Sequence, residues 1–176
     1  KPKAMAIVGA GPVGVEFAQI FSRFGVAVTL LEMAPHILPN DDDEPAMELE
    51  KILSAEGIRI ECGAKVQNVE ADGDTKMINW MRDGVEMSAP VDTILVATGR
   101  RPDFDKLNLE AAGVETKKGG VVVDGWLRTS VPHIRAAGDV TGTLPFTHVA
   151  SAQAHYLVHN MDKDDPPPFD YTGIPW

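Results

Sequence analysis

A glycine-rich segment between two apolar runs is the feature that most constrains how this chain can fold. Residues 4–32 read AMAIVGAGPVGVEFAQIFSRFGVAVTLLE and contain the spacing G-x-G-x-x-G at Gly9, Gly11 and Gly14. Gly9 allows a sharp turn out of a buried strand, Gly11 removes a side chain that would block a pyrophosphate, and Gly14 allows the next helix to pack closely on the sheet. The segment therefore predicts a dinucleotide-binding turn.

The flanking residues supply the context that this motif requires. Ala4–Val8 predicts a buried strand, a helix is expected to start near Pro12 and end at Gly25, and Val26–Leu31 predicts a second buried strand. Apolar residues recur at helical spacing at Val13, Phe17, Ile20, Phe21 and Phe24. The order strand, helix, strand, acid favours a dinucleotide site over a glycine turn in an ordinary α/β core.

The acid that ends the segment indicates which dinucleotide is bound. The helix start near Pro12 offers free N–H groups to phosphates, and Glu32 can accept hydrogen bonds from a ribose hydroxyl pair. Glu32 would repel a 2′-phosphate, and residues 33–39 (MAPHILP) contain no arginine, so NAD(H) is favoured over NADP(H). His36 could add positive charge if protonated, but we expect it to be a solvated loop residue.

Composition argues against several classes of partner. A chain of 176 residues that is 44% hydrophobic can bury a core, and its net charge of -10 argues against binding to nucleic acid or anionic membranes. No run approaches the roughly 18 to 20 apolar residues of a membrane-spanning helix. Residues 1–3 lead into a strand without a signal peptide, so a cytoplasmic location is expected.

Cys62 is the only cysteine, which excludes an internal disulfide or a two-cysteine redox pair within these residues. Its neighbours Ile60 and Gly63 suggest a buried strand end, so an inert thiol is expected rather than a reactive one. The sequence has no cluster of Cys or His at ligand spacing, and no metal site is predicted.

The next residues complete a first domain. Acids at 41–44 are expected at the amino end of a second helix, where they would cap it and face its dipole, and Ile58–Glu61 predicts a third strand. Residues 65–96 alternate in short segments with hairpin turns at 72–74 and 83–84. Val91–Ala97 predicts a final buried strand. The prediction is a Rossmann-like α/β domain with a parallel sheet and an inserted β-meander, ending near Thr98.

Residues from Gly99 onward are rich in charge and turns. Ile134–Asp139 predicts a strand that ends on a carboxylate, and a helix is expected from about Thr147 to Asn160. An aspartate beside a helix N-terminus can hold a hydroxylated or anionic ligand, although a simple turn aspartate is an equally open interpretation. Residues 164–168 (DDPPP) break the helix, and the following residues form no closing element, so we expect the sequence to be part of a longer chain.

Three ordered segments carry a resemblance to a known family. GAGPVGVEFA (9–18), ATGRRPD (97–103) and RTSVPHIRAAGDVTG (128–142) with LPFTHVASAQA (144–154) resemble the FAD-dependent pyridine nucleotide disulfide oxidoreductases. The dihydrolipoamide dehydrogenase branch is the most similar, and mercuric reductase and glutathione reductase are relatives. The resemblance implies an NAD-binding domain at 1–98, the C-terminal part of an FAD-binding domain at 99–160, and at 161–176 the lead-in to a dimerisation domain.

The resemblance also implies roles for single residues. The glycine turn, including Pro12 and Val13, would hold the NAD pyrophosphate and Glu32 the adenosine ribose. Val66 would line the adenine pocket, while Gly99 and Glu16 would lie near the nicotinamide. On the flavin side, Asp139 would bind the FAD ribityl chain. Backbone amides would face the flavin pyrimidine over Pro145, Phe146, Thr147 and His148.

Other parts of the family pattern are missing from these 176 residues. They are the amino-terminal FAD fingerprint, the redox-active cysteine pair and the dimer domain with its catalytic histidine. We therefore expect an NAD(H)-binding fragment, inactive alone, of a homodimeric enzyme that passes electrons between NADH, FAD and a disulfide. A stand-alone NAD(H)-binding module and a single-cysteine NADH oxidase relative are alternatives, and lipoamide, mercuric ion, glutathione and other disulfides remain open as acceptors.

Overall fold

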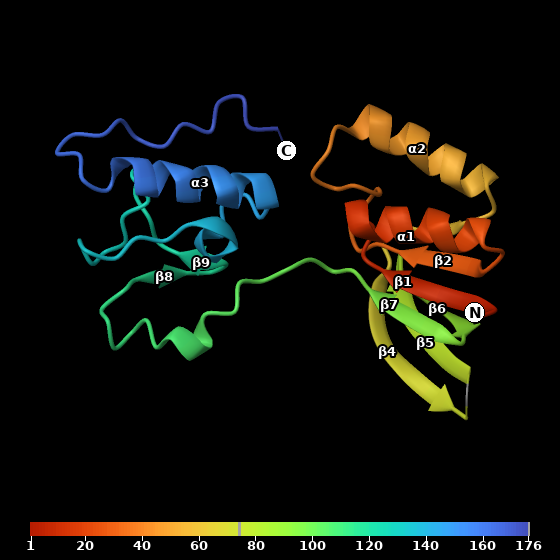
Figure 1. The fold of residues 1–176 in the computed structure, drawn as a ribbon. Helices are drawn as coiled ribbons and strands as arrows, with labels where there is room; N and C mark the ends of the chain where they lie inside the picture. Colours follow the sequence, from red (N-terminus) through yellow and green to blue (C-terminus); the bar gives the residue numbers. More distant parts are fainter. Residues whose placement is uncertain (74, 176) are drawn as a thin grey trace. The chain divides into compact units, whose positions relative to one another are not determined.

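The computed structural model describes residues 1–73 and 75–175. The chain divides into two compact units, Lys1–Gly99 and Arg100–Trp176, and each is described by itself (Figure 1). Asp74 in a predicted turn and Trp176 in the predicted final segment lie outside the described residues.

A four-stranded parallel sheet forms the centre of the first unit. Its order is β3-β2-β1-β7, and two helices, α1 and α2, lie on one face (Figure 1). Val8 is in register with Leu31 and with Val96, so three strands reach the same edge together. The elements are β1 (Ala4–Val8), α1 (Pro12–Arg23), β2 (Ala27–Leu31), α2 (Asp43–Ala55), β3 (Arg59–Glu61) and β7 (Thr93–Val96).

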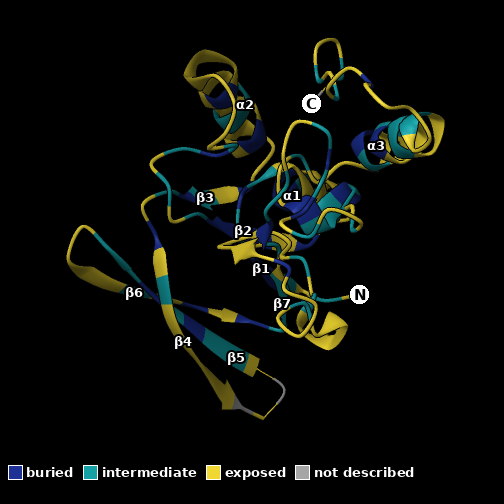
Figure 2. Ribbon diagram, turned by 90° about the vertical axis from the view of Figure 1, so that its left-hand side faces the viewer, coloured by how far each residue is buried: buried dark blue, intermediate teal, exposed yellow. Residues whose placement is uncertain are grey.

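The opposite face of the parallel sheet carries a three-stranded antiparallel sheet, inserted between β3 and β7. Its order is β4-β5-β6, and its strands are β4 (Lys65–Asp72), β5 (Thr75–Arg82) and β6 (Val85–Val91). β5 carries the fully buried Ile78 and Trp80, whereas β4 and β6 are mostly exposed (Figure 2). The α/β fold with a parallel sheet and a β-meander, predicted from the sequence, is confirmed.

Strand β1 is buried on both sides because its side chains alternate between two apolar layers. Met5 and Ile7 pack with the helices, while Ala6 packs with Trp80 of the meander. This alternation gives the unit three layers: helices, parallel sheet and antiparallel sheet.

Two exposed surfaces differ from what the sequence suggests. The recurring apolar residues of α1 point largely outward, with Val13 55% and Ile20 46% exposed, because Gly14 and Ala18 form the face that packs closely on the sheet. The prediction that the last strand is buried is wrong at its end. Val96 is 69% exposed because β7 is the outermost strand in the order, with β1 as its neighbour.

The second unit is built from short elements and one long helix. The elements are η1 (Asp105–Leu107), β8 (Thr116–Lys117), β9 (Gly120–Val121), η2 (Gly138–Thr141) and α3 (Thr147–Asn160). The helix predicted from Thr147 to Asn160 is confirmed. None of the helices in the described residues has the length and apolar character needed to cross a membrane.

The predicted strand at 134–139 is wrong. Arg135 makes an isolated bridge with Arg128, and the chain then turns at Gly138, whose φ of 79° belongs to the left-handed region. Asp139 therefore lies in η2, a 3₁₀ turn, instead of at a strand tip.

A buried carboxylate joins the parallel sheet to the meander. Glu61 of β3 is 6% exposed and accepts hydrogen bonds from Arg59 at 2.8 Å and from Arg82 of β5 at 2.5 Å. The Arg59 guanidinium also lies 5.3 Å from the centre of the Trp80 ring. Burial alone would raise the pKa of Glu61, but the hydrogen bonds from the two arginines hold it below its ordinary value.

Replacing Glu61 with Gln should lower the free energy of unfolding of the first unit by about 1–3 kcal/mol at pH 7, because two charge-assisted hydrogen bonds are lost. The pKa of Glu61 in the folded chain is lower than in the unfolded chain, where it is roughly 4.3. The carboxylate therefore stabilises the fold fully above pH roughly 4.3, and this contribution disappears as the pH falls through the pKa of the folded chain. Urea denaturation followed by amide NMR signals of β3 and β5 measures the difference. Glu86→Gln, at an exposed position, is the control. If the loss of unfolding free energy in Glu61→Gln stayed constant down to pH 3, the lowered pKa of Glu61 would be contradicted.

Candidate functional site

Several of the predicted nucleotide-binding residues come from the carboxyl edge of the parallel sheet. The glycine turn follows β1, Glu32 follows β2, and Gly99 lies three residues beyond the end of β7. Because these strands are parallel and in register, their ends share one edge, which is where open α/β sheets bind ligands.

Two of the three fingerprint glycines are required by the fold itself. Gly9 has a φ of 99°, and a Cβ there would lie 2.5 Å from the carbonyl oxygen of Ala97. A Cβ on Gly14 would overlap the carbonyl oxygen of Gly9. These glycines allow the turn, the start of α1 and the segment after β7 to pack backbone against backbone.

Gly11 has no such structural requirement. Its φ of -69° and ψ of -178° are extended values that any residue adopts, and a Cβ there would meet no atom within 4 Å. Neither backbone strain nor packing within the described residues explains a glycine at this position. An open space over the turn is what a ligand that must approach the backbone would need.

The helix that starts at this space supplies hydrogen-bond donors. Gly11 is the N-cap of α1, and its carbonyl accepts from Val15 at 3.0 Å. Pro12 has no N–H, so the first-turn donors without an intrahelical partner are those of Val13 and Gly14. No acidic residue stands in this first turn to offset the positive end of the helix dipole. Glu16, one turn further, is exposed.

Glu32 has a contact that sequence reasoning missed. Its carboxylate accepts a hydrogen bond from the N–H of Ala10, within the glycine turn, at 2.6 Å, and from Ala34 at 2.9 Å. Glu32 therefore holds the glycine turn in place. The backbone of Ala64 donates to the Glu32 carbonyl at 2.8 Å, which brings the start of β4, with Val66, beside the end of β2.

His36 is not the solvated loop residue that the sequence suggests. Its side chain is only 20% exposed, with Nδ1 donating to the carbonyl of Ile37 at 2.8 Å and Nε2 lying 3.2 Å from Asp43. Asp42 is the N-cap of α2 but makes no side-chain cap, and Asp43 and Glu44 occupy the first turn. The acids at the start of α2 thus face the positive end of its dipole, and Asp43 also pairs with His36. The predicted side-chain cap is absent.

Cys62 has the environment of an unreactive thiol. Burial, followed by the charges of Glu50 and Glu32, raises its pKa to about 12. A thiol with such a pKa carries very little thiolate at neutral pH, in agreement with the inert role expected from the sequence.

In the second unit, Asp139 is surrounded by groups that fix its position. Its carboxylate is 35% exposed and lies 3.1 Å from the guanidinium of Arg100. The preceding Gly138 donates its N–H at 2.6 Å to Gln153 of α3, and the amide of Gln153 donates to Tyr171 at 2.8 Å. Gln153 is fully buried. Neither Arg100 nor Gln153 was recognised as a site residue from the sequence, because their partners are distant along the chain.

The amides predicted to face a flavin are fewer than the sequence suggested. Pro145 has no N–H, and Phe146 donates its own to Leu144 at 2.8 Å. The first-turn amides of Thr147 and His148 remain. The His148 ring stacks on Phe146 with 5.5 Å between centroids and contacts the Pro175 carbonyl at 2.6 Å.

Residues 1–154 match the family model described as pyridine nucleotide-disulphide oxidoreductase. The chain belongs to this family. It is 39% identical over 153 residues to the dihydrolipoyl dehydrogenase of Mycobacterium leprae, covering 86% of this chain and 33% of that protein. It is 38% identical to the Chlorobaculum tepidum enzyme of the same name, covering 99% of this chain and 37% of that protein. The chain therefore spans about a third of these curated relatives.

Solved structures of the family share the fold. LpdA from Mycobacterium tuberculosis superposes with a TM-score of 0.85 at 29% identity, covering 96% of this chain and 36% of that one. The HOCl-induced flavoprotein disulfide reductase RclA from Escherichia coli gives a TM-score of 0.82 at 32% identity, covering 95% of this chain and 38% of that one. The resemblance predicted from the three motifs is confirmed.

The open space over Gly11 leads to a direct test. Gly11→Val should abolish dinucleotide binding, because branched carbons would occupy that space, while lowering stability by no more than about 1 kcal/mol at an extended N-cap position. Gly14→Ala is the matched contrast, since its Cβ overlaps the Gly9 carbonyl and should cost about 1–3 kcal/mol of stability. Calorimetric titration with NADH measures the nucleotide affinity, and thermal unfolding measures the stability. Unchanged NADH affinity in Gly11→Val would refute a ligand role for this glycine.

Proposed function

We propose that Lys1–Gly99 is an NAD(H)-binding domain, with the pyrophosphate over the turn of Gly9, Gly11 and Gly14. The observation that carries this proposal is the open space at Gly11, where the fold gives no reason for a glycine. The free N–H groups of Val13 and Gly14 and the uncompensated helix dipole favour an anion at this place. Membership of a pyridine nucleotide family supports the same ligand class.

Glu32 selects the nucleotide in this proposal. Its two oxygens accept hydrogen bonds from backbone N–H groups, and each oxygen retains acceptor capacity for a ribose hydroxyl. A 2′-phosphate at the same place would meet a carboxylate, and His36 directs its ring at Asp43. NAD(H) is therefore preferred over NADP(H). Val66 would border the adenine, while Glu16 and Gly99 would lie toward the nicotinamide.

We assign Arg100–Trp176 to the C-terminal part of an FAD-binding domain and its lead-in to a dimer domain. The residues present fit one part of a flavin: Asp139 offers a partly exposed carboxylate for hydroxyl groups, and the first-turn amides of Thr147 and His148 can face an electron-rich ring edge. FAD would supply the two-electron redox chemistry between the nicotinamide and a disulfide. In this chain Arg100 would hold Asp139, and Gln153 would hold the turn before it.

The whole activity belongs, in this proposal, to a longer homodimeric enzyme that resembles dihydrolipoyl dehydrogenase. RclA, one of the structural relatives, is a flavoprotein disulfide reductase. The 176 residues contain one cysteine, whose pKa is raised to about 12, so they hold no redox-active thiol pair. We infer that the chain alone binds NAD(H) without catalysing electron transfer.

Calorimetric titration with NADH and NADPH tests the nucleotide assignment. The chain should bind NADH at least about tenfold more tightly than NADPH, a difference of about 1.4 kcal/mol. Glu32→Gln retains an acceptor for the Ala10 N–H but removes the negative charge. The difference between the NADH and NADPH affinities should therefore narrow. NADH should bind more weakly, and the 2′-phosphate of NADPH should be repelled less.

Glu70→Gln, a change on exposed β4, is the charge-matched control and should leave the ratio unchanged. Equal affinities for the two nucleotides in the unaltered chain would contradict the role of Glu32. A preference for NADPH would do so as well.

A further inference from the structure

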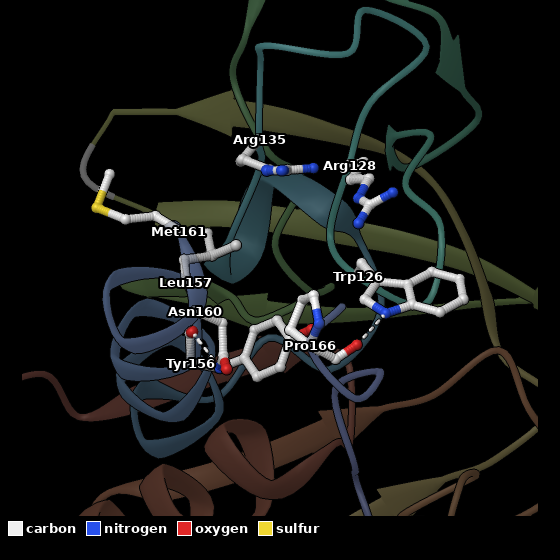
Figure 3. A pocket seen from close by; sticks show the side chains of 8 residues that line it. All are labelled: Trp126, Arg128, Arg135, Tyr156, Leu157, Asn160, Met161 and Pro166. Carbon is white, nitrogen blue, oxygen red and sulfur yellow. Dashed lines mark hydrogen bonds between the residues drawn. The ribbon is translucent and has the colours of Figure 1, made fainter. Parts of the chain in front are cut away.

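A small hollow in the second unit lies outside the residues assigned to either cofactor. Figure 3 shows two arginines, Arg128 and Arg135, on one side of it, above Trp126, with side chains of α3 on the other side. The cavity volume is about 20 Å³. It therefore has room for one buried oxygen, and its mouth is open to solvent.

The two arginines are held next to each other by the backbone. Arg128 and Arg135 form the isolated antiparallel bridge of this unit, so their side chains leave neighbouring positions, and the Arg135 guanidinium extends toward Arg128 (Figure 3). Within residues 1–73 and 75–175, neither makes an ion pair or a side-chain hydrogen bond. Two like charges at neighbouring positions repel each other, and an anion between them would relieve this repulsion.

Arg128 contributes a buried donor without a partner. Its Nε is shielded from solvent and has no hydrogen-bond partner in the described residues, while its guanidinium lies 5.3 Å from the centre of the Trp126 ring. The Trp126 indole is itself fixed by a hydrogen bond to the Pro166 carbonyl at 2.9 Å. An unpaired buried N–H costs free energy that a ligand oxygen would recover. The ring stacking keeps the guanidinium in place before a ligand arrives.

Nearby acids do not neutralise this pair. The Asp124 carboxylate accepts from the backbone N–H groups of Trp126 and Arg128, both at 2.9 Å, so it serves the turn. Asp162, Asp164 and Asp165 follow α3, and none of them makes an ion pair with either arginine. A water molecule could satisfy the Arg128 Nε, but it would leave both positive charges unpaired.

We propose that Arg128 and Arg135 form a binding site for a phosphate-type oxyanion. One oxygen enters the hollow and accepts from the Arg128 Nε, and the remaining oxygens accept from Arg135 at the mouth. Planar guanidinium groups match the geometry of phosphate oxygens, and a doubly charged phosphate compensates two arginines better than a single carboxylate does. The site is independent of the proposed nucleotide and flavin roles.

The test is an NMR titration of the whole chain with inorganic phosphate, observing the arginine Nε–H signals. The Arg128 signal should shift saturably with a Kd of about 1 mM, and acetate should bind at least about tenfold more weakly. Arg135→Gln should weaken phosphate binding about tenfold, as measured from the Arg128 Nε–H signal. Arg128→Lys keeps the charge but removes the buried Nε, and should weaken binding similarly.

Arg101→Gln removes an exposed arginine of the same unit and should leave phosphate binding unchanged. A response that does not saturate, or an equal loss in Arg101→Gln, would show that only general charge attraction operates and would overturn the site. Acetate binding as tightly as phosphate would overturn the assignment to a phosphate-type ligand. The phosphate titration observes arginine signals of the second unit, whereas the NADH titration concerns the glycine turn of the first unit. A failure of the proposed NADH site is therefore distinguishable from a failure of the phosphate site.

Discussion

The first unit depends on backbone packing at one edge of its parallel sheet. The turn at Gly9 lies against the carbonyl of Ala97, and α1 begins so close to this turn that Gly14 meets the Gly9 carbonyl. No side chain fits between these segments. The helix N-terminus is therefore fixed directly over the ends of β1 and β2, and the carboxylate of Glu32 is brought within 2.6 Å of the turn at Ala10. The positions of the glycine turn and of the α1 N-terminus in the candidate nucleotide site follow from this contact.

The sequence predicted this part of the fold well because its signals are local. The order of strands and helices, the glycine spacing and the hairpin turns each arise from neighbouring residues, and the sequence motifs suffice to indicate the family. The glycine motif also predicted a separate role for each glycine. The three-dimensional packing agrees, because a Cβ would clash at Gly9 and Gly14 but meets open space at Gly11.

The features that sequence reasoning missed depend on partners distant along the chain. Apolar spacing indicated that α1 is a helix but not which face it turns to the sheet. Val13 is 55% exposed, while the small residues Gly14 and Ala18 face the sheet. The expected strand before Asp139 needed neighbouring strands that the described residues do not provide, and Gly138 turns the chain instead. Gln153 is held by contacts to Gly138 and Tyr171, 15 and 18 residues away. Hydrophobic periodicity carries no information about such contacts.

The central claim is that NADH binds over the glycine turn of the first unit, and its most direct test is an NMR titration of the ¹⁵N-labelled chain with NADH. The account predicts saturable shifts with a single Kd at the amides of Gly9, Ala10, Gly11, Val13 and Gly14, and unchanged amides across Arg100–Trp176. Saturable shifts centred on α3, or no saturable shift at the glycine turn, would contradict it.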